Sequence, residues 1–158
     1  MGLRFPSQHH GECFFVTTTF RDWRPHGNSP GFYEDLVESL RFCLDKYAAR
    51  LAGYALMPSH VHLVVFANGT QLSGMMRDFK KYTGQKIAAD RGIKGGIWMP
   101  RYDRVATWSE NVMRTKLEYI HQNRVKARLV AVATEWQWSS AGDYLTDRQG
   151  PLPVWKNW

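Results

Sequence analysis

The ten-residue stretch 57–66 is the feature of this chain that most constrains its fold. It reads MPSHVHLVVF, an apolar run rich in β-branched residues, and this composition is typical of a β-strand. Side chains two positions apart on a strand point to the same face of the sheet, so His60 and His62 share one face. Val61 and Leu63 share the other. The sequence therefore predicts a strand that is apolar on one side and carries two imidazoles on the other.

Strand and helix patterns alternate through the rest of the chain. Aromatic and β-branched runs predict strands, apolar residues at helical spacing predict helices, and clusters of proline and glycine predict loops. The predicted strands cover 13–20, 50–57 and 61–66, with a short fourth strand drawn from 97–100 and 104–107. The predicted helices cover 32–47, 73–89 and 109–129, with Ser73 as an N-cap and a turn at 68–69. This order favours one α+β domain over residues 1–158, with a single antiparallel sheet backed by helices.

The composition favours a nucleic-acid partner. The chain has 158 residues, of which 44% are hydrophobic, and this suits one domain with its own core. Its net charge of +7 and pI of about 9.6 favour a polyanion, nucleic acid first and an anionic membrane second. Aromatic residues make up 14% of the chain. Rings that stack on bases, together with basic groups that meet phosphates, suit single-stranded nucleic acid.

Three features predict a cytoplasmic protein that does not enter a membrane. No apolar run approaches the roughly 20 residues that span a bilayer. Residues 1–6 are not followed by a long apolar core, so they do not resemble a signal peptide. Cys13 and Cys43 lack the Cys-x-x-Cys spacing, and a reduced chain with both thiols packed as small apolar groups is the simplest interpretation.

The predicted third helix offers a second set of reactive groups. Tyr119 and Asn123 are four residues apart, so they share a helix face, and Lys116 and Lys126 lie near the same stripe. A tyrosine phenol can attack a phosphodiester to form a phosphotyrosine. The amide oxygen of Asn123 can join the two histidines around Mg²⁺ or Mn²⁺ and leave positions open for phosphate oxygens. The adjacent Gln122 stays open as the third ligand.

Four sequence blocks carry a resemblance to a known family. Residues 57–63 stand in place of Met-Pro-Asn-His-Val-His-Leu, and residues 96–102 in place of a Trp-Gln block that follows a glycine. Residues 119–127 are close to Tyr-Ile-x-x-Asn-Pro-Val-Arg-Ala, and residues 136–140 repeat Trp-x-Trp-Ser-Ser. In this order the blocks resemble the HUH single-tyrosine transposases, which include the IS200-like and REP-associated tyrosine transposases. The resemblance covers most of the chain.

The resemblance implies a fold, a chemistry and a set of site residues. The fold would be the ferredoxin-like or RRM-like HUH fold. His60 and His62 would be metal ligands, Asn123 would take the third-ligand place, and Tyr119 would be the nucleophile. The reaction would nick single-stranded DNA near a hairpin, leaving a 5′-phosphotyrosine and a 3′-OH, in DNA transposition or REP-element processing. The protein would be bacterial and associated with the nucleoid when bound to DNA, and a homodimer is left open.

Three residues depart from the family pattern, and other residues are candidates for DNA contact. Ser59 replaces Asn, Arg124 replaces Pro so that the third helix can extend to Leu129, and Lys126 replaces Arg. None of these changes removes a catalytic atom, so we expect activity. The predicted DNA-binding residues are Lys80, Lys81, Lys86, Arg101, Arg104, Lys116, Arg124 and Lys126 for phosphates, with Trp98 and Tyr102 for stacking on bases.

Two further readings stay open beside the tyrosine strand transferase. One is a non-catalytic module that binds single-stranded DNA or RNA, and the other is a metal phosphodiesterase that uses water as its nucleophile. Tyr82 on the second helix is a competing nucleophile, but position 86 is a lysine, so Tyr82 lacks the carboxamide that follows Tyr119. The histidine pair and the pairing of Tyr119 with Asn123 favour the strand transferase.

Overall fold

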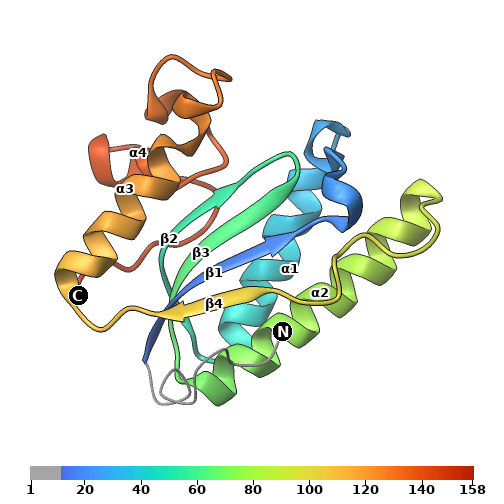
Figure 1. Ribbon diagram of the computed structural model, residues 1–158, viewed down its shortest axis with the longest axis horizontal. Helices are drawn as coiled ribbons and strands as arrows, with labels where there is room; N and C mark the ends of the chain where they lie inside the picture. Colours follow the sequence, from blue (N-terminus) through green and yellow to red (C-terminus); the bar gives the residue numbers. More distant parts are fainter. Residues whose placement is uncertain (1–11) are drawn as a thin grey trace.

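The computed structural model describes residues 12–158, and its centre is one antiparallel sheet of four strands in the order β2-β3-β1-β4 (Figure 1). The strands are β1 (Cys13–Thr19), β2 (Arg50–Leu56), β3 (His60–Phe66) and β4 (Asp103–Ala106). The helices are α1 (Phe32–Lys46), α2 (Gly69–Arg91), α3 (Glu110–Lys126) and α4 (Ala141–Leu145), with short 3-10 turns at η2 (Arg21–Trp23), η3 (His26–Asn28) and η4 (Ala133–Glu135). The predicted α+β class with a single antiparallel sheet is confirmed.

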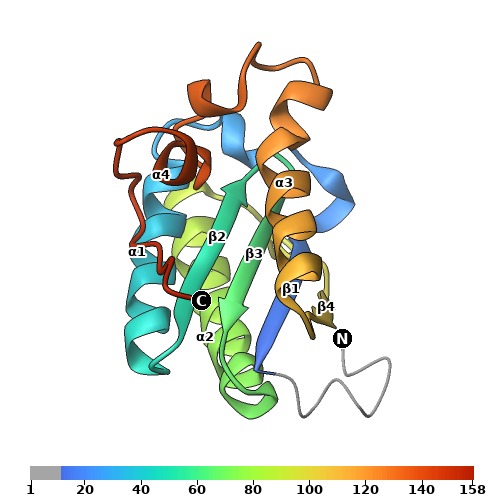
Figure 2. The same cartoon turned by 90° about the vertical axis from the view of Figure 1, so that its left-hand side faces the viewer.

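Helices cover the two faces of the sheet unequally. Phe14 and Val16 of β1 and Leu63 of β3 point into the larger core, which α1 and α2 cover. On the opposite face α3 packs over β2 and β3, where Leu117 and Ile120 meet small strand residues in a second core. Figures 1 and 2 show α1 and α2 on one side and α3 on the other, with β1 and β4 beyond α3. The α3 face of the sheet is therefore only partly covered.

Gly53 of β2 sets how closely α3 approaches the sheet. The Leu117 side chain occupies the space in which a Cβ on Gly53 would lie, and the Ile120 Cδ1 atom is 3.5 Å from that point. A larger residue at position 53 would therefore require the Leu117 side chain to move.

Two helix boundaries differ from the sequence prediction. α2 begins at Gly69 and not at residue 73, because the Asn68 side chain accepts a hydrogen bond from the Gln71 amide while the Gln71 side chain accepts one from Asn68. This capping box starts a helix where a turn was predicted. α3 ends at Lys126, and Arg128 takes a left-handed φ of 59° that stops the helix short of Leu129.

The C-terminal segment runs along the outer edge of β2 (Figure 2). The Leu56 amide donates to the Trp138 carbonyl at 2.8 Å, and the Trp155 amide donates to the Leu51 carbonyl at 2.8 Å. The Trp136 indole N–H donates to the Leu56 carbonyl. These bonds hold the tail segment with its tryptophans against the sheet, and they pair an edge of β2 that would otherwise be open.

Two predictions about the whole chain can be compared with the described residues. Cys13 and Cys43 are both buried and form no disulfide, as expected for packed thiols. Within residues 12–158 no helix is both long and apolar enough to cross a bilayer. The first eleven residues, on which the signal-peptide prediction rests, lie outside the part that the structure describes.

Asp78 of α2 fastens the end of α1, and its loss is expected to destabilise the fold. Its carboxylate accepts hydrogen bonds from Lys46 at 2.8 Å, from the Tyr47 hydroxyl at 2.5 Å and from Arg77 at 3.3 Å. The Lys46 and Tyr47 bonds hold the pKa of Asp78 at about 2. Asp78→Asn should lower the free energy of unfolding at neutral pH by about 1–3 kcal/mol, because charge-assisted hydrogen bonds are lost.

The pH dependence of this loss has a defined sign. A carboxyl whose pKa is lower in the folded chain stabilises the fold above its ordinary pKa, and that stabilisation disappears as the pH falls toward the folded value. In urea unfolding, the difference between wild type and Asp78→Asn should be constant from pH 7 to about pH 5 and shrink toward pH 2. Asp45→Asn, an exposed acid at the end of α1, is the matched control and should change little. A difference that stays constant down to pH 2 would contradict this assignment.

Candidate active site

The two predicted histidines lie side by side on the partly covered face of β3. His60 pairs with Thr19 of β1, and His62 pairs with Thr17. The two imidazole rings are 4.6 Å apart between centroids and meet edge to face. The strand begins at His60, one residue earlier than predicted, immediately after the Pro58-Ser59 turn. The period-two alternation of the strand is what brings both rings to one place.

Each histidine has a hydroxyl bound at Nδ1. The Thr17 Oγ1 atom is 3.0 Å from His62 Nδ1, and the Ser59 Oγ atom is 3.0 Å from His60 Nδ1. When Nδ1–H donates to the hydroxyl, Nε2 presents its lone pair, which is the arrangement that metal-binding histidines use. His62 Nε2 is buried and has no hydrogen-bond partner within residues 12–158. The pair therefore directs at least one unsatisfied nitrogen into the site.

Burial keeps both imidazoles neutral at physiological pH. Desolvation lowers the pKa of His60 to about 4, with a further contribution from the charge of Arg124. Desolvation lowers the pKa of His62 to about 3, with a further contribution from His60. Neutral imidazoles are the form that binds a metal ion.

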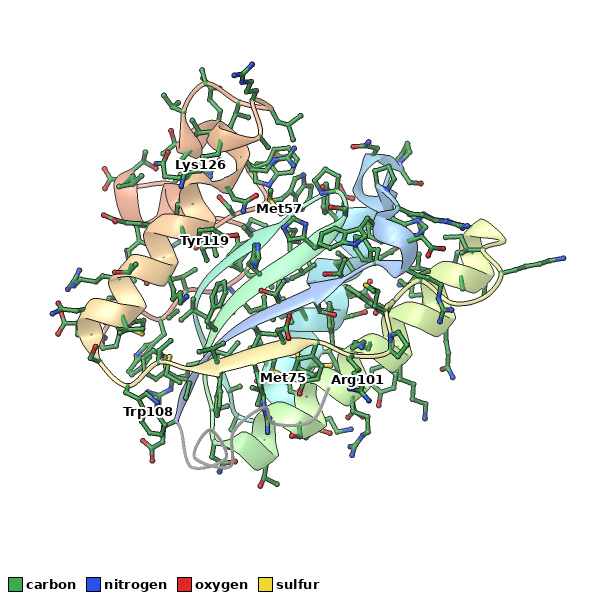
Figure 3. The ribbon with its side chains drawn as sticks, in the orientation of Figure 1. Met57, Met75, Arg101, Trp108, Tyr119 and Lys126 are labelled. Atoms are coloured by element: carbon green, nitrogen blue, oxygen red, sulfur yellow. The ribbon has the colours of Figure 1, made fainter. Side chains whose placement is uncertain are left out.

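Tyr119 of α3 lies directly beside the histidines. Its ring centroid is 5.6 Å from that of His62 and 6.1 Å from that of Phe15. The Phe15 ring in turn stacks on His62, and the Lys116 ammonium lies 5.0 Å from the Phe15 centroid. The Tyr119 side chain is 45% exposed, and Figure 3 shows it on α3 beside the strands. The phenol is thus both close to the imidazoles and open to a large substrate.

The two histidines alone are too few ligands for a hard divalent ion, so a carboxamide must be counted with them. Within residues 12–158 no three His, Cys, Asp or Glu side chains gather as a metal site. Asn123 is half-buried one turn after Tyr119 on the same face of α3, whereas Gln122 is exposed. Two neutral imidazoles, one of them unsatisfied, and a carboxamide oxygen suit Mg²⁺ or Mn²⁺.

Two other polar residues of α3, His121 and Arg124, are buried in contacts with the C-terminal segment. His121 is buried, and its Nε2 atom lies 2.7 Å from Ser140 Oγ, so it packs against the C-terminal segment. Arg124 is buried over the Trp136 ring at 3.7 Å. The guanidinium is therefore not free on the surface for the phosphate contact that the sequence suggested.

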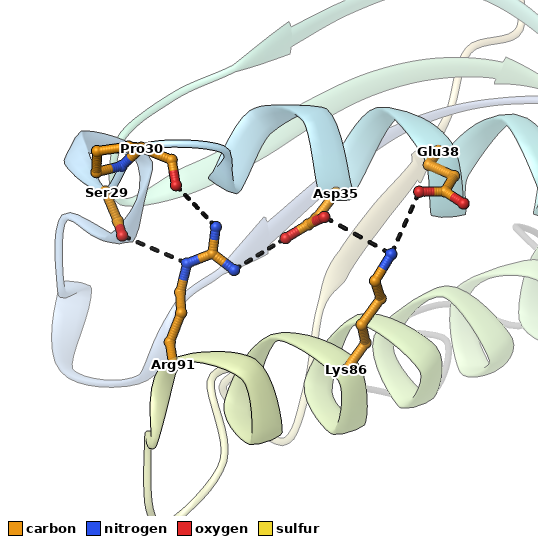
Figure 4. Close-up of polar contacts among 6 residues, drawn as sticks. All are labelled: Ser29, Pro30, Asp35, Glu38, Lys86 and Arg91. Atoms are coloured by element: carbon orange, nitrogen blue, oxygen red, sulfur yellow. Dashed lines mark hydrogen bonds and ion pairs between the residues drawn. The ribbon is translucent and has the colours of Figure 1, made fainter.

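Several predicted DNA-contacting residues are engaged elsewhere. Trp98 is buried and donates from its indole to Thr83 Oγ1 at 2.8 Å, so its ring is not available for stacking on bases. Arg104 is buried on the α2 side and donates to the Gly69 carbonyl and to Ser73. Lys86 joins α2 to α1 through Asp35 and Glu38, next to the Arg91 contacts (Figure 4). Trp98 and Arg104 are thus buried and bonded within the fold, whereas the DNA contact of the exposed Lys86 stays a prediction.

The remaining predicted contacts divide by position. Lys80 donates to the Met99 and Pro100 carbonyls and lies 5.7 Å from the half-buried Tyr102 ring. Burial lowers the pKa of the Lys80 ammonium. Lys81, Arg101 and Lys126 are exposed, and Figure 3 shows Lys126 near the end of α3 and Arg101 before β4. Lys116 meets the site through the Phe15 ring.

Sequence reasoning missed three side chains of the site. Thr17 and Phe15 are two residues apart on β1, so they share the face that carries His62. The pairing register of β1 with β3 places both side chains against His62, and sequence alone does not give that register. Trp23 of η2 lies with its ring 6.1 Å from His60. A hollow of about 1060 Å³ lies away from all of these, between α1 and the segment 138–153.

Comparisons with known proteins agree with this geometry. Residues 24–123 match the family model "Transposase IS200 like". A REP-associated tyrosine transposase solved with a REP hairpin superposes with a TM-score of 0.75 at 22% identity, covering 98% of this chain and 95% of that one. A candidate transposase of Deinococcus radiodurans superposes with a TM-score of 0.52 at 17% identity, covering 77% and 95%. Functionally curated proteins gave no match. Since the family model matches well over half of the chain, the chain belongs to the IS200-like transposase family.

Proposed function

We propose that this transposase nicks single-stranded DNA and transfers the strand through a covalent bond to Tyr119. The observation that carries the proposal is the position of the Tyr119 phenol, half-exposed beside His62, which is itself paired with His60. A nucleophile next to two neutral imidazoles on an open sheet face supports attack on a phosphodiester.

The chemistry at Tyr119 balances without an energy source. The phenol oxygen attacks the phosphorus, the bond from phosphorus to the 3′ oxygen breaks, and a 5′-phosphotyrosine forms. The phenol loses a proton and the departing 3′ oxygen gains one. Attack by a 3′-OH on the phosphotyrosine reverses the step and joins strands. One bond is exchanged for another of the same type in each direction.

His60, His62 and Asn123 would hold the divalent ion. When bound, Mg²⁺ or Mn²⁺ supplies Lewis-acid polarisation of the phosphate. Thr17 and Ser59 fix the orientation of the two rings through Nδ1, and Phe15 shields the His62 ring by stacking. These contacts support a site whose ligands are oriented before DNA binds.

The substrate is single-stranded DNA next to a hairpin. The protein is basic, with a net charge of +7, and Lys116 provides a cation beside the nucleophile. A similarly folded transposase was solved on a REP hairpin, which supports a hairpin as the recognition element. Tyr119 and both histidines come from the same chain at contact distance, which supports a site built within one chain. A homodimer is then not needed for catalysis.

A label-transfer experiment tests this function. The full chain is incubated with a library of labelled hairpins carrying single-stranded extensions, with Mg²⁺, Mn²⁺ or EDTA, and is run on a denaturing gel. We expect a labelled protein band that requires the metal ion. Retention of DNA with no covalent band under any metal would favour the binding module, and release of cleaved DNA with no covalent band would favour the water-dependent phosphodiesterase.

A further inference from the structure

Trp23 is a large aromatic residue that the fold leaves in solvent. Its side chain is 61% exposed, and its neighbours Arg21, Asp22 and Arg24 are exposed as well. By contrast, Trp98, Trp136 and Trp158 donate their indole N–H groups to Thr83, Leu56 and Tyr144. Within residues 12–158 the Trp23 indole makes no hydrogen bond. Its ring is therefore free to stack on a ligand.

The place of Trp23 relates it to the active site. Its ring centroid is 6.1 Å from that of His60, His60 is 4.6 Å from His62, and His62 is 5.6 Å from Tyr119. The four rings therefore form a row, with the nucleophile at one end and the exposed indole at the other. DNA whose phosphate lies at the histidines then has Trp23 on the His60 side and Tyr119 on the His62 side.

The backbone holds Trp23 in an unusual conformation. Asp22 and Trp23 both have left-handed φ values, 56° and 54°, which are disfavoured for residues with a side chain and most of all for a bulky one. The Arg21 amide donates to the Ile97 carbonyl at 2.8 Å, and the Trp23 amide donates to the Phe20 carbonyl at 3.0 Å. These bonds attach the turn to the end of β1, so the backbone from which the indole projects has a defined place beside the site. Strained residues of this kind cluster at binding sites.

We propose that Trp23 is a stacking platform for an unpaired nucleobase next to the phosphate held at His60 and His62. The inference rests on the proposed function for the identity of the ligand as single-stranded DNA. An aromatic face accepts any base, and the flanking Arg21 and Arg24 suit the neighbouring phosphates. A base stacked on Trp23 fixes the position of its nucleotide relative to His60. The stacked base therefore determines which phosphate along the strand reaches Tyr119.

The test measures binding separately from cleavage. In the Tyr119→Phe chain, fluorescence anisotropy gives the affinity for a labelled hairpin with a single-stranded extension, and for a series with one abasic nucleotide moved along that extension. Trp23→Ala should weaken binding about 5- to 100-fold, the usual contribution of one stacked base. With the abasic nucleotide at the position facing Trp23, the Tyr119→Phe chain and the same chain with Trp23→Ala should bind equally. Trp23→Phe should recover most of the affinity.

Trp108 provides the matched control. It is 66% exposed and precedes α3 at a different part of the sheet (Figure 3), so Trp108→Ala should bind every oligonucleotide like the parent chain. The proposal is overturned if Trp23→Ala has unchanged affinity, or if its loss is the same at every abasic position. Label transfer by the chain with Tyr119 intact is read in parallel. A covalent band with no effect of Trp23 rejects the platform alone, and an abasic-specific effect with no covalent band rejects the proposed chemistry alone.

Discussion

Tyr119→Phe is expected to eliminate the covalent protein–DNA product while leaving hairpin binding within about twofold. The change removes one oxygen from a side chain that is 45% exposed and makes no hydrogen bond within residues 12–158, so folding and DNA contact have little to lose. The nucleophile is lost completely, and no second group restores a covalent bond. The measurement is label transfer on a denaturing gel, with anisotropy on the same oligonucleotide.

Tyr82→Phe is the control for this prediction. Tyr82 was the competing candidate, and it lies half-buried on α2 next to Phe42, on the helix layer that covers the other face of the sheet. Label transfer by this variant should match wild type. A covalent band that persists in Tyr119→Phe and disappears in Tyr82→Phe would move the nucleophile to α2.

His62→Gln is expected to reduce metal-dependent label transfer by at least about 100-fold. Glutamine retains a polar group that can bond to Thr17, but it lacks the imidazole Nε2 that is now buried without a partner. Mn²⁺ binding, measured by titration calorimetry, should weaken in parallel. Hairpin binding in EDTA should be nearly unchanged, because it depends on basic and aromatic groups elsewhere.

The comparison of metal binding with DNA binding separates a ligand from a DNA contact. If His62→Gln bound Mn²⁺ like wild type and lost hairpin affinity instead, the imidazole would be part of the DNA surface. A thermal unfolding curve close to that of wild type would show that the loss of the ring stacked on Phe15 has not unfolded the strand.

The parts of the site that follow a local period were predictable from sequence. The alternation through 60–66 predicted that both histidines of β3 lie on one face of the sheet. The spacing of Tyr119 and Asn123 predicted that they share one face of α3. The family and the single antiparallel sheet are confirmed. The roles of the individual site residues stay predictions.

Residues whose partners are distant in sequence were assigned less well. Trp98 was predicted to stack on bases, yet Thr83 on α2 buries it. Arg104 and Lys86 were predicted to contact phosphate, yet they bond to α2 and α1. Because a charged or aromatic residue looks the same whether its partner is solvent, DNA or another helix, only the tertiary structure separates these cases.

The left-handed turn at Trp23 shows a different limit. A loop lies between the predicted strand 13–20 and the predicted helix 32–47, but the residues that adopt positive φ in η2 are not glycines: they are an aspartate and a tryptophan. One of the hydrogen bonds that hold this turn runs from Arg21 to Ile97, which is distant in sequence, so a local pattern alone does not reveal the conformation.

The close contact of Gly53 with Leu117 means that β2, which carries no reactive side chain, helps to set the distance between α3 and the sheet. We expect that a bulky side chain at position 53, which must displace Leu117, shifts α3 and Tyr119 relative to the histidines on β3. The distance between the nucleophile and the histidines would then depend on the bulk of a β2 residue that has no role in the proposed chemistry.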